Sequence, residues 1–271
     1  MLHLMLKDGN FKDYLESKQS TIAASLNCTS RDFYICNTNT FQQIIQLATS
    51  LVGTKGVLVY FSTNKVYSKT KRTLGGLHNE TADCIRSIPF DEKDEVYIDK
   101  NDKELARTFA CESVISEFCK LNNINSCVFR PGCIVGYKPE ISDGFLAKAL
   151  VAYKTKTPFE VYGSGGQKQV RDQLAIWDVV NAITAFSNAL TKINGEVFNI
   201  GGGLDNAISI QQLFLLMRNR GMELEAKDLP QEPSKEIPMP YYVTNYSKFY
   251  KATHWRPLSS INSIIDQMLI S

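Results

Sequence analysis

Three short apolar runs constrain this chain most. VLVYFST at 57–63 is continuous, β-branched and aromatic, and SCVFRP at 126–131 and EVFNIG at 196–201 follow the same pattern. A strand without polar alternation is covered on both faces, as in parallel sheets. Helical patterns lie between the runs, so the sequence predicts an α/β fold built on a parallel sheet.

Apolar residues at helical spacing predict helices at 39–51, 103–121, 209–220 and 260–269. The third of these has the clearest ends, because Ser209 and Gln212 form a capping box at its start and a glycine follows its last turn.

Two stretches interrupt the pattern. Residues 68–103 are polar and lysine-rich, and we interpret them as a loop insertion. Residues 225–243 contain four prolines, which predicts irregular structure. From about residue 135 the chain mixes short elements, which predicts a smaller lobe beside the sheet.

Charge and cysteine content exclude several classes of partner. Thirty basic and 28 acidic residues leave a net charge of +2, which gives no electrostatic case for nucleic-acid binding. No apolar run reaches the roughly 18–20 residues of a membrane span, and the apolar start is too short for a signal peptide.

The seven cysteines contain no CxxC pair. We interpret them as reduced, mostly buried thiols, and predict a cytoplasmic protein without a metal site.

STNKVYS at 62–68 is the first candidate site. It follows a predicted buried strand and therefore lies at the carboxyl end of that strand, where open α/β sheets bind ligands. The side chains of Ser62, Thr63 and Asn64 can bind a ribose, a nicotinamide or a sugar. The alternative interpretation is a helix cap or a turn.

Five segments, in order, resemble the extended short-chain dehydrogenase/reductase family, particularly its CDP-tyvelose (CDP-paratose) epimerase branch. STNKVY resembles the second hydroxyl motif of the family, and FRPGCIVG at 129–136 resembles the segment that covers the nicotinamide. Three later segments resemble the substrate lobe, the Phe-Asn-Ile-Gly-Gly-Gly stretch and the usual ending of the family; they span 161–183, 195–213 and 254–265.

The resemblance implies a Rossmann-type domain that binds NAD and a C-terminal lobe that binds a nucleotide sugar. Relatives oxidise a sugar carbon to a ketone and return the hydride on the other face. We accordingly divide the chain into a partial Rossmann-like NAD(P)-binding region, 1–135, and the remaining sheet elements with the substrate lobe, 136–271. A homodimer is also predicted as possible, because relatives pair through a helix that matches 103–121.

The resemblance also implies roles for single residues. Thr63 matches the catalytic hydroxyl, which would hydrogen-bond the reacting sugar oxygen. Ser62 and Asn64 beside it become cofactor-binding candidates. The segment along the nicotinamide adds four more candidates, Arg130, Pro131, Gly132 and Cys133. Of these, Arg130 is interpreted as mainly structural. A nucleophilic role for this cysteine is not predicted, since no histidine stands near it in sequence.

In the substrate lobe, Arg171 matches an arginine that reaches the nucleotide phosphates. Gln169 and Asn199 are further substrate-binding candidates by the same resemblance. The alternative for Arg171 is an ion pair with Asp172. We interpret the glycines at 201–203 as backbone-packing residues, the alternative being a phosphate cradle.

The start of the chain departs from the family. Relatives open with a strand, a Gly-x-x-Gly-x-x-Gly turn and a helix that holds the pyrophosphate. Before residue 57 this chain has only Gly9, Gly53 and Gly56. We interpret LHLML at 2–6 as the fourth strand of the family, which leaves the first three strands absent and an open sheet edge. NAD binding is therefore expected to be impaired.

The catalytic Tyr-x-x-x-Lys pair is the second departure. Counting back from Arg130 without a gap puts Glu104 and Thr108 at the two positions. A short gap puts Phe109 and Ser113 there, and neither alignment restores the pair. Glu104 as a base is the remaining alternative, but it lacks a partnering lysine.

Three hypotheses follow from the sequence. The first is a degenerate epimerase-family protein that retains nucleotide-sugar binding. The second is an active NAD-dependent nucleotide-sugar epimerase completed by a second chain that supplies the missing N-terminal part. The third is a non-catalytic scaffold or regulatory subunit that uses the exposed sheet edge.

Overall fold

The computed structural model describes residues 1–5, 9–26, 31–38, 40–67, 79–80, 85–99, 101–136, 144–162, 166–190, 193–229 and 239–270. Along the chain the strands are β1 (Leu2–Met5), β2 (Phe33–Cys36), β3 (Val57–Phe61), β4 (Asn79–Glu80), β5 (Ile85–Arg86), β6 (Asn125–Pro131), β7 (Cys133–Val135), β8 (Phe159–Val161), β9 (Val170–Ala175), β10 (Glu196–Ile200), β11 (Ala207–Ser209), β12 (Ala226–Asp228) and β13 (Tyr241–Tyr242). The α-helices are α1 (Gly9–Ser17), α2 (Gln19–Ser25), α3 (Phe41–Ser50), α5 (Lys103–Leu121), α6 (Phe145–Thr155), α7 (Ile176–Asn188), α8 (Ile210–Arg218), α9 (Ser247–Thr253) and α10 (Ile261–Ile270), and the short 3₁₀ turns are η1 (Asn64–Val66), η3 (Gly166–Lys168) and η4 (Leu204–Asn206).

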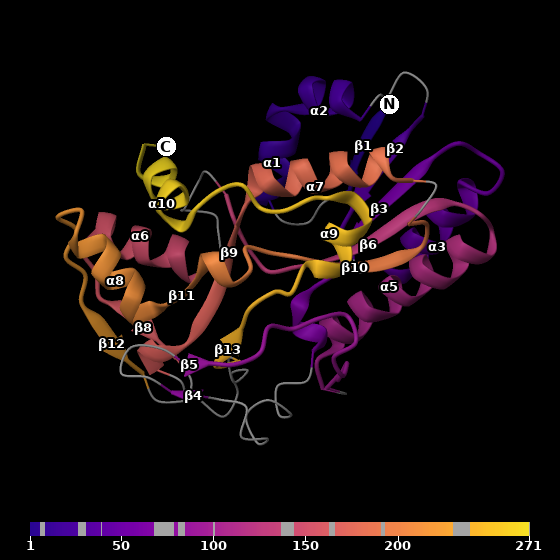
Figure 1. Ribbon diagram of the computed structural model, residues 1–271. Helices are drawn as coiled ribbons and strands as arrows, with labels where there is room; N and C mark the ends of the chain where they lie inside the picture. The colour runs from indigo at the N-terminus through magenta and orange to yellow at the C-terminus, as the bar shows by residue number, and fades with distance from the viewer. Residues whose placement is uncertain are drawn as a thin grey trace.

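A five-stranded parallel sheet, in the order β1-β2-β3-β6-β10, forms the centre of the larger lobe. Helices α1, α2 and α7 cover one face, and α3 and α5 cover the other (Figure 1). All five residues of β3 are buried, as its unbroken apolar run predicts. The α/β class and the parallel sheet are confirmed.

Alternate residues of β3 supply two separate cores. Val57 and Val59 point to the face where they pack with Ile22 of α2 and Phe186 of α7. Leu58 and Tyr60 point to the opposite face, where they pack with α3 and α5. Each fully buried aliphatic or aromatic side chain contributes roughly 1.5–3 kcal/mol, so this one strand anchors both helical layers.

The position of the first strand corrects the sequence interpretation. β2, which that interpretation missed, lies between β1 and β3 and is the strand that precedes β3 along the chain. The assignment of LHLML to the fourth strand of the family is therefore wrong. Among the described strands β1 pairs only with β2.

Two kinds of crossover connect these strands. The step from β1 to β2 runs through α1 and α2 on one face, whereas the next two steps run through α3 and α5 on the opposite face. All three steps move the same way across the sheet, so the first has the opposite hand to the other two. Parallel crossovers are right-handed in about 98% of cases. A doubly wound sheet avoids this conflict by placing its next strands on the other side of the first.

The second lobe stands at the left of Figure 1 and contains α6, α8, α10 and the strands around β9. The predicted helices at 39–51, 103–121, 209–220 and 260–269 are confirmed as α3, α5, α8 and α10, and α8 has the predicted capping box. The prediction of irregular structure at 225–243 is wrong at its ends, because β12 and β13 pair there with β8 and β9. Residues 230–238, and residues 68–78, 81–84 and 100 of the predicted insertion, lie outside the described residues.

Candidate functional site

A buried ion pair joins α5 to β6. The Nε of Arg130 donates to both carboxylate oxygens of Glu112, at 3.2 and 3.1 Å, and its Nη2 also contacts the same carboxylate. The two residues are only 5% and 2% exposed. This pair holds α5 in position against β6. It thereby also sets where Glu104 and Thr108, on the same helix, lie relative to the end of β6.

Tyr67 extends this pair into a network. Its hydroxyl donates to Asn199 Oδ1 at 2.6 Å and accepts from Arg130 Nη1 at 3.1 Å. Burial raises the pKa of Tyr67 to about 12. Asn199 also donates through Nδ2 to the Phe90 carbonyl at 3.1 Å. The polar side-chain atoms of Tyr67 and Asn199 are thus engaged inside the protein, and Arg130 is held from two sides.

The turn after β3 contains the predicted catalytic hydroxyl. Thr63 Oγ1 accepts the Lys65 N–H at 3.2 Å and caps η1, which is the cap alternative noted from the sequence. This bond uses the hydroxyl oxygen as an acceptor, and the side chain is only half-buried, so its hydroxyl hydrogen can be donated to a ligand. Ser62 beside it is buried, and its hydroxyl has no hydrogen-bond partner among the described residues. Asn64 begins η1 and is half-buried.

Helix α5 turns an apolar face to this turn. Leu105 and Phe109 pack with Val66 and Tyr67. Glu104 is exposed, and the Thr108 hydroxyl donates to the Glu104 carbonyl of its own helix at 3.0 Å. Neither described side chain at the predicted Tyr and Lys positions therefore has the chemistry of that pair.

The segment after β6 lies between two sheets. Gly132 N donates to the Ile200 carbonyl at 2.8 Å, and Cys133 pairs with Gln173 where β7 meets β9. Burial raises the pKa of the Cys133 thiol to about 11, so the sulfur stays protonated at neutral pH. Pro131 ends β6 half-buried.

The described cysteines agree with the sequence interpretation. All five are free, and four of them are buried. Cys28 and Cys84 lie outside the described residues.

Asp172 anchors the point where β6, β9 and β10 meet, a role that the sequence alone does not reveal. It is fully buried, and its Oδ2 accepts the Gly203 N–H at 3.0 Å. A Cβ atom at Gly201 would lie 2.4 Å from Asp172 Oδ2, and one at Gly202 would lie 2.1 Å from the Gln173 carbonyl oxygen. The interpretation of these glycines as packing residues is confirmed.

A methyl group at Gly201 should therefore destabilise the fold. We expect Gly201→Ala to lower the free energy of unfolding by about 1–3 kcal/mol, because its Cβ would lie 2.0 Å from Thr244 Oγ1. Gly144→Ala is the control, since open space surrounds that position, and only its cap preference should register, at less than about 1 kcal/mol. Urea unfolding measures both; equal losses would show that close packing at Gly201 is not the cause.

Arg171 is the predicted substrate residue with donors to spare. It is half-buried, its Nη1 donates to the Val170 carbonyl at 2.7 Å, and burial lowers its pKa. No ion pair joins it to Asp172, because consecutive strand residues point to opposite faces; that alternative is wrong. Gln169, in contrast, is buried and donates its amide to the Tyr162 carbonyl.

A dinucleotide would have a different fit at its two ends. The unpaired Ser62 hydroxyl and the Thr63 hydroxyl at the end of β3 suit a nicotinamide or ribose contact. The adenosine end needs the crevice that forms where strand order reverses. Among the described strands the order runs one way from β1, without such a reversal. The residues directly after β1, 6–8, lie outside the described residues.

Within the residues that the structure describes, no helix is both long and apolar enough to cross a membrane. Nor does that part of the chain bring three His, Cys, Asp or Glu side chains together in a way that would hold a metal ion.

Comparison with known proteins agrees with this architecture. The model of the NAD dependent epimerase/dehydratase family matches residues 16–201. CDP-paratose 2-epimerase of Salmonella typhi is 26% identical over 225 residues, which cover 78% of this chain and 63% of the relative. The chain thus spans less than two thirds of that relative's length.

Solved structures show the same fold. UDP-glucuronic acid 4-epimerase from Bacillus cereus, in complex with UDP-glucuronic acid and NAD, superposes with a TM-score of 0.72 at 15% identity, over 99% of this chain and 90% of the other. UDP-glucose 4-epimerase from Thermotoga maritima, with UDP-glucose, gives 0.65 at 16% identity, over 100% and 98%. At these identities the likeness concerns the fold.

Proposed function

This chain belongs to the NAD dependent epimerase/dehydratase family, and on that premise we propose that it binds a nucleotide sugar but is impaired in hydride transfer. One observation carries the second half of the proposal. By the ungapped count from Arg130, the family's tyrosine and lysine positions hold an exposed Glu104 and a Thr108 bonded to its own helix. With a short gap they hold Phe109 and Ser113, and the face of α5 toward the turn after β3 is apolar.

Arg171 supports nucleotide-sugar binding. A half-buried guanidinium with unused donors, and with no ion pair to any carboxylate in the part of the chain that the structure describes, is suited to a diphosphate, which accepts charge-assisted hydrogen bonds from its planar fork. The relatives named above act on or were solved with CDP- and UDP-linked sugars. The proposed ligand is accordingly a sugar linked to a nucleoside diphosphate.

The chemistry available to the bound sugar is incomplete. NAD, when bound, supplies the hydride acceptor of this family. The Thr63 hydroxyl can donate to a sugar oxygen and hold it, but it cannot take up the proton released on oxidation. Tyr67 cannot do so either, because its hydroxyl is already bonded to Asn199 and Arg130. A missing general base lowers the rate by roughly 10²–10⁴-fold.

Binding and turnover are tested separately. In calorimetric titrations with UDP-glucose and CDP-glucose, we expect Arg171→Ala to weaken binding by about tenfold or more. Arg218→Ala, at an exposed position on α8, is the matched control and should leave affinity unchanged. With NAD added, turnover should be at least about 10²-fold slower than that of an active family member assayed in parallel.

The two halves of the proposal can be refuted independently. Equal affinity of the wild-type chain and Arg171→Ala would remove the proposed phosphate contact. Turnover at the rate of the active relative would overturn the impairment and leave nucleotide-sugar binding intact.

A second candidate is an active epimerase completed by another chain. The outer edge of β1 favours it, because among the described strands only β2 pairs with β1. The crossover from β1 to β2 also has the opposite hand to the next two crossovers, which is expected if a doubly wound sheet lacks the strands that would lie beyond β1. Turnover confined to a complex with a second polypeptide would favour this candidate over simple impairment.

A further inference from the structure

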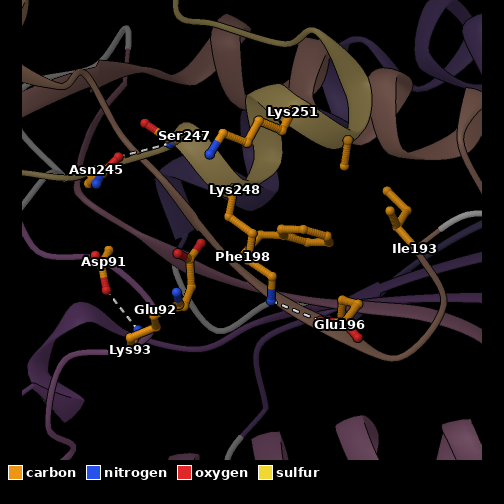
Figure 2. Close-up of a pocket in the computed structure, with 11 residues that line it drawn as sticks. Asp91, Glu92, Lys93, Ile193, Glu196, Phe198, Asn245, Ser247, Lys248 and Lys251 are labelled. Carbon is orange, nitrogen blue, oxygen red and sulfur yellow. Dashed lines mark hydrogen bonds and ion pairs between the residues drawn. The ribbon is translucent and has the colours of Figure 1, made fainter.

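A hollow lies along the outer edge of β10, where Glu196 and Phe198 line it. Its volume is about 680 Å³, within the roughly 300–1,000 Å³ typical of small-molecule pockets. Figure 2 shows residues 91–93 on one side of it and α9 on the other. The lining residues used below are Asp91, Glu92, Lys93, Asn245, Ser247 and Lys251.

The backbone edge in this hollow is already capped by side chains. Lys248 Nζ donates to the Val197 carbonyl at 2.7 Å, and Asn199 N donates to Glu92 Oε1 at 2.6 Å. An added β-strand would need these same backbone groups. The hollow therefore suits a small molecule rather than an extended peptide.

Two amines at the hollow form no ion pair with a described residue. Lys248 is neutralised by Glu196 at 2.8 Å, and that carboxylate also meets Lys120 at 3.2 Å. Lys93 and Lys251, by contrast, form no ion pair with any residue that the structure describes, and they line the hollow from opposite sides. An anion between them would meet two ammonium groups that are not engaged in an ion pair with any described residue.

The neutral and acidic groups are arranged asymmetrically. On the α9 side, Asn245 Oδ1 accepts the Ser247 N–H at 3.0 Å, which leaves the Asn245 amide nitrogen and the exposed Ser247 hydroxyl as donors. On the other side, Asp91 and Glu92 present carboxylates, which accept hydrogen bonds from hydroxyl groups. The polarity matches a ligand with an anionic end and a hydroxylated end.

We propose that this hollow binds a sugar phosphate, with the phosphate held by Lys251 and Lys93 and the sugar hydroxyls donating to Asp91 and Glu92. The site is separate from Arg171 and does not depend on the proposed function.

Calorimetric titration at low salt tests the proposal, with glucose 1-phosphate and inorganic phosphate as probes. We expect glucose 1-phosphate to bind with a Kd on the order of 100 μM. The double variant Lys93→Gln/Lys251→Gln should weaken this binding by about tenfold or more, since it removes two charge-assisted contacts. Lys227→Gln, an exposed lysine on β12 outside the hollow, is the control and should bind like the wild type.

Three outcomes would overturn the proposal. The first is no binding of either probe at about 10 mM. The second is binding that Arg171→Ala abolishes while the double lysine variant does not, which would place the ligand in the second lobe. The third is equal affinity for inorganic phosphate and glucose 1-phosphate, which would remove the sugar from the assignment.

Discussion

Replacing Glu112 with alanine is expected to lower the free energy of unfolding by about 3–5 kcal/mol, the largest effect of any single change predicted for this chain. The variant leaves the Arg130 guanidinium buried without its counter-charge, since the arginine is only 5% exposed and Tyr67 supplies a neutral oxygen alone. Urea unfolding monitored by circular dichroism measures the loss.

Two further variants separate the buried charge from other effects. Glu117→Ala removes an exposed carboxylate from the same helix, and its cost should stay within about 0.5 kcal/mol. The double variant Glu112→Leu/Arg130→Met removes both charges and should be more stable than Glu112→Ala alone. If Glu112→Ala and Glu117→Ala cost the same, the buried ion pair does not stabilise the fold.

The sequence pattern predicted the layers better than the site. The bounds of α5 follow from its own residues, because Asp102 caps its start and its apolar side chains recur at helical spacing. β2 was missed because its four residues, FYIC, are too few for a periodicity to be read. α7 was missed because it continues directly from the buried strand β9, without a polar or glycine break between them.

Partners distant in sequence explain what the pattern left out of the site. Arg130 could be placed at the end of a strand, but its partner Glu112 lies 18 residues away and Tyr67 lies 63 away. Asp172 follows Arg171 in the matched motif, yet its contact is with Gly203 in a different segment. Resemblance identified the segments that meet, and only the packed chain shows which side chains remain available to a ligand.

The buried Asp172 should make stability depend on pH in an unusual direction. Burial raises the pKa of this carboxyl from 3.8 to about 6. A group whose pKa is higher in the folded than in the unfolded state binds its proton more tightly when folded, so protonation stabilises the fold. That stabilisation is complete below about pH 3.8 and is lost as the pH rises through about 6. This rise in the pKa corresponds to roughly 3 kcal/mol.

Asp172→Asn removes this titration and keeps an oxygen that can accept the Gly203 N–H. The stability of the wild type relative to Asp172→Asn should therefore fall by up to about 3 kcal/mol between pH 4 and pH 7.5. Asp205→Asn, at an exposed position, should follow the wild type at every pH. Urea unfolding at several pH values gives the comparison. A constant difference between the wild type and Asp172→Asn would mean that the carboxyl keeps its ordinary pKa, and that burial at the junction of β6, β9 and β10 is offset by hydrogen bonds to the ionised form.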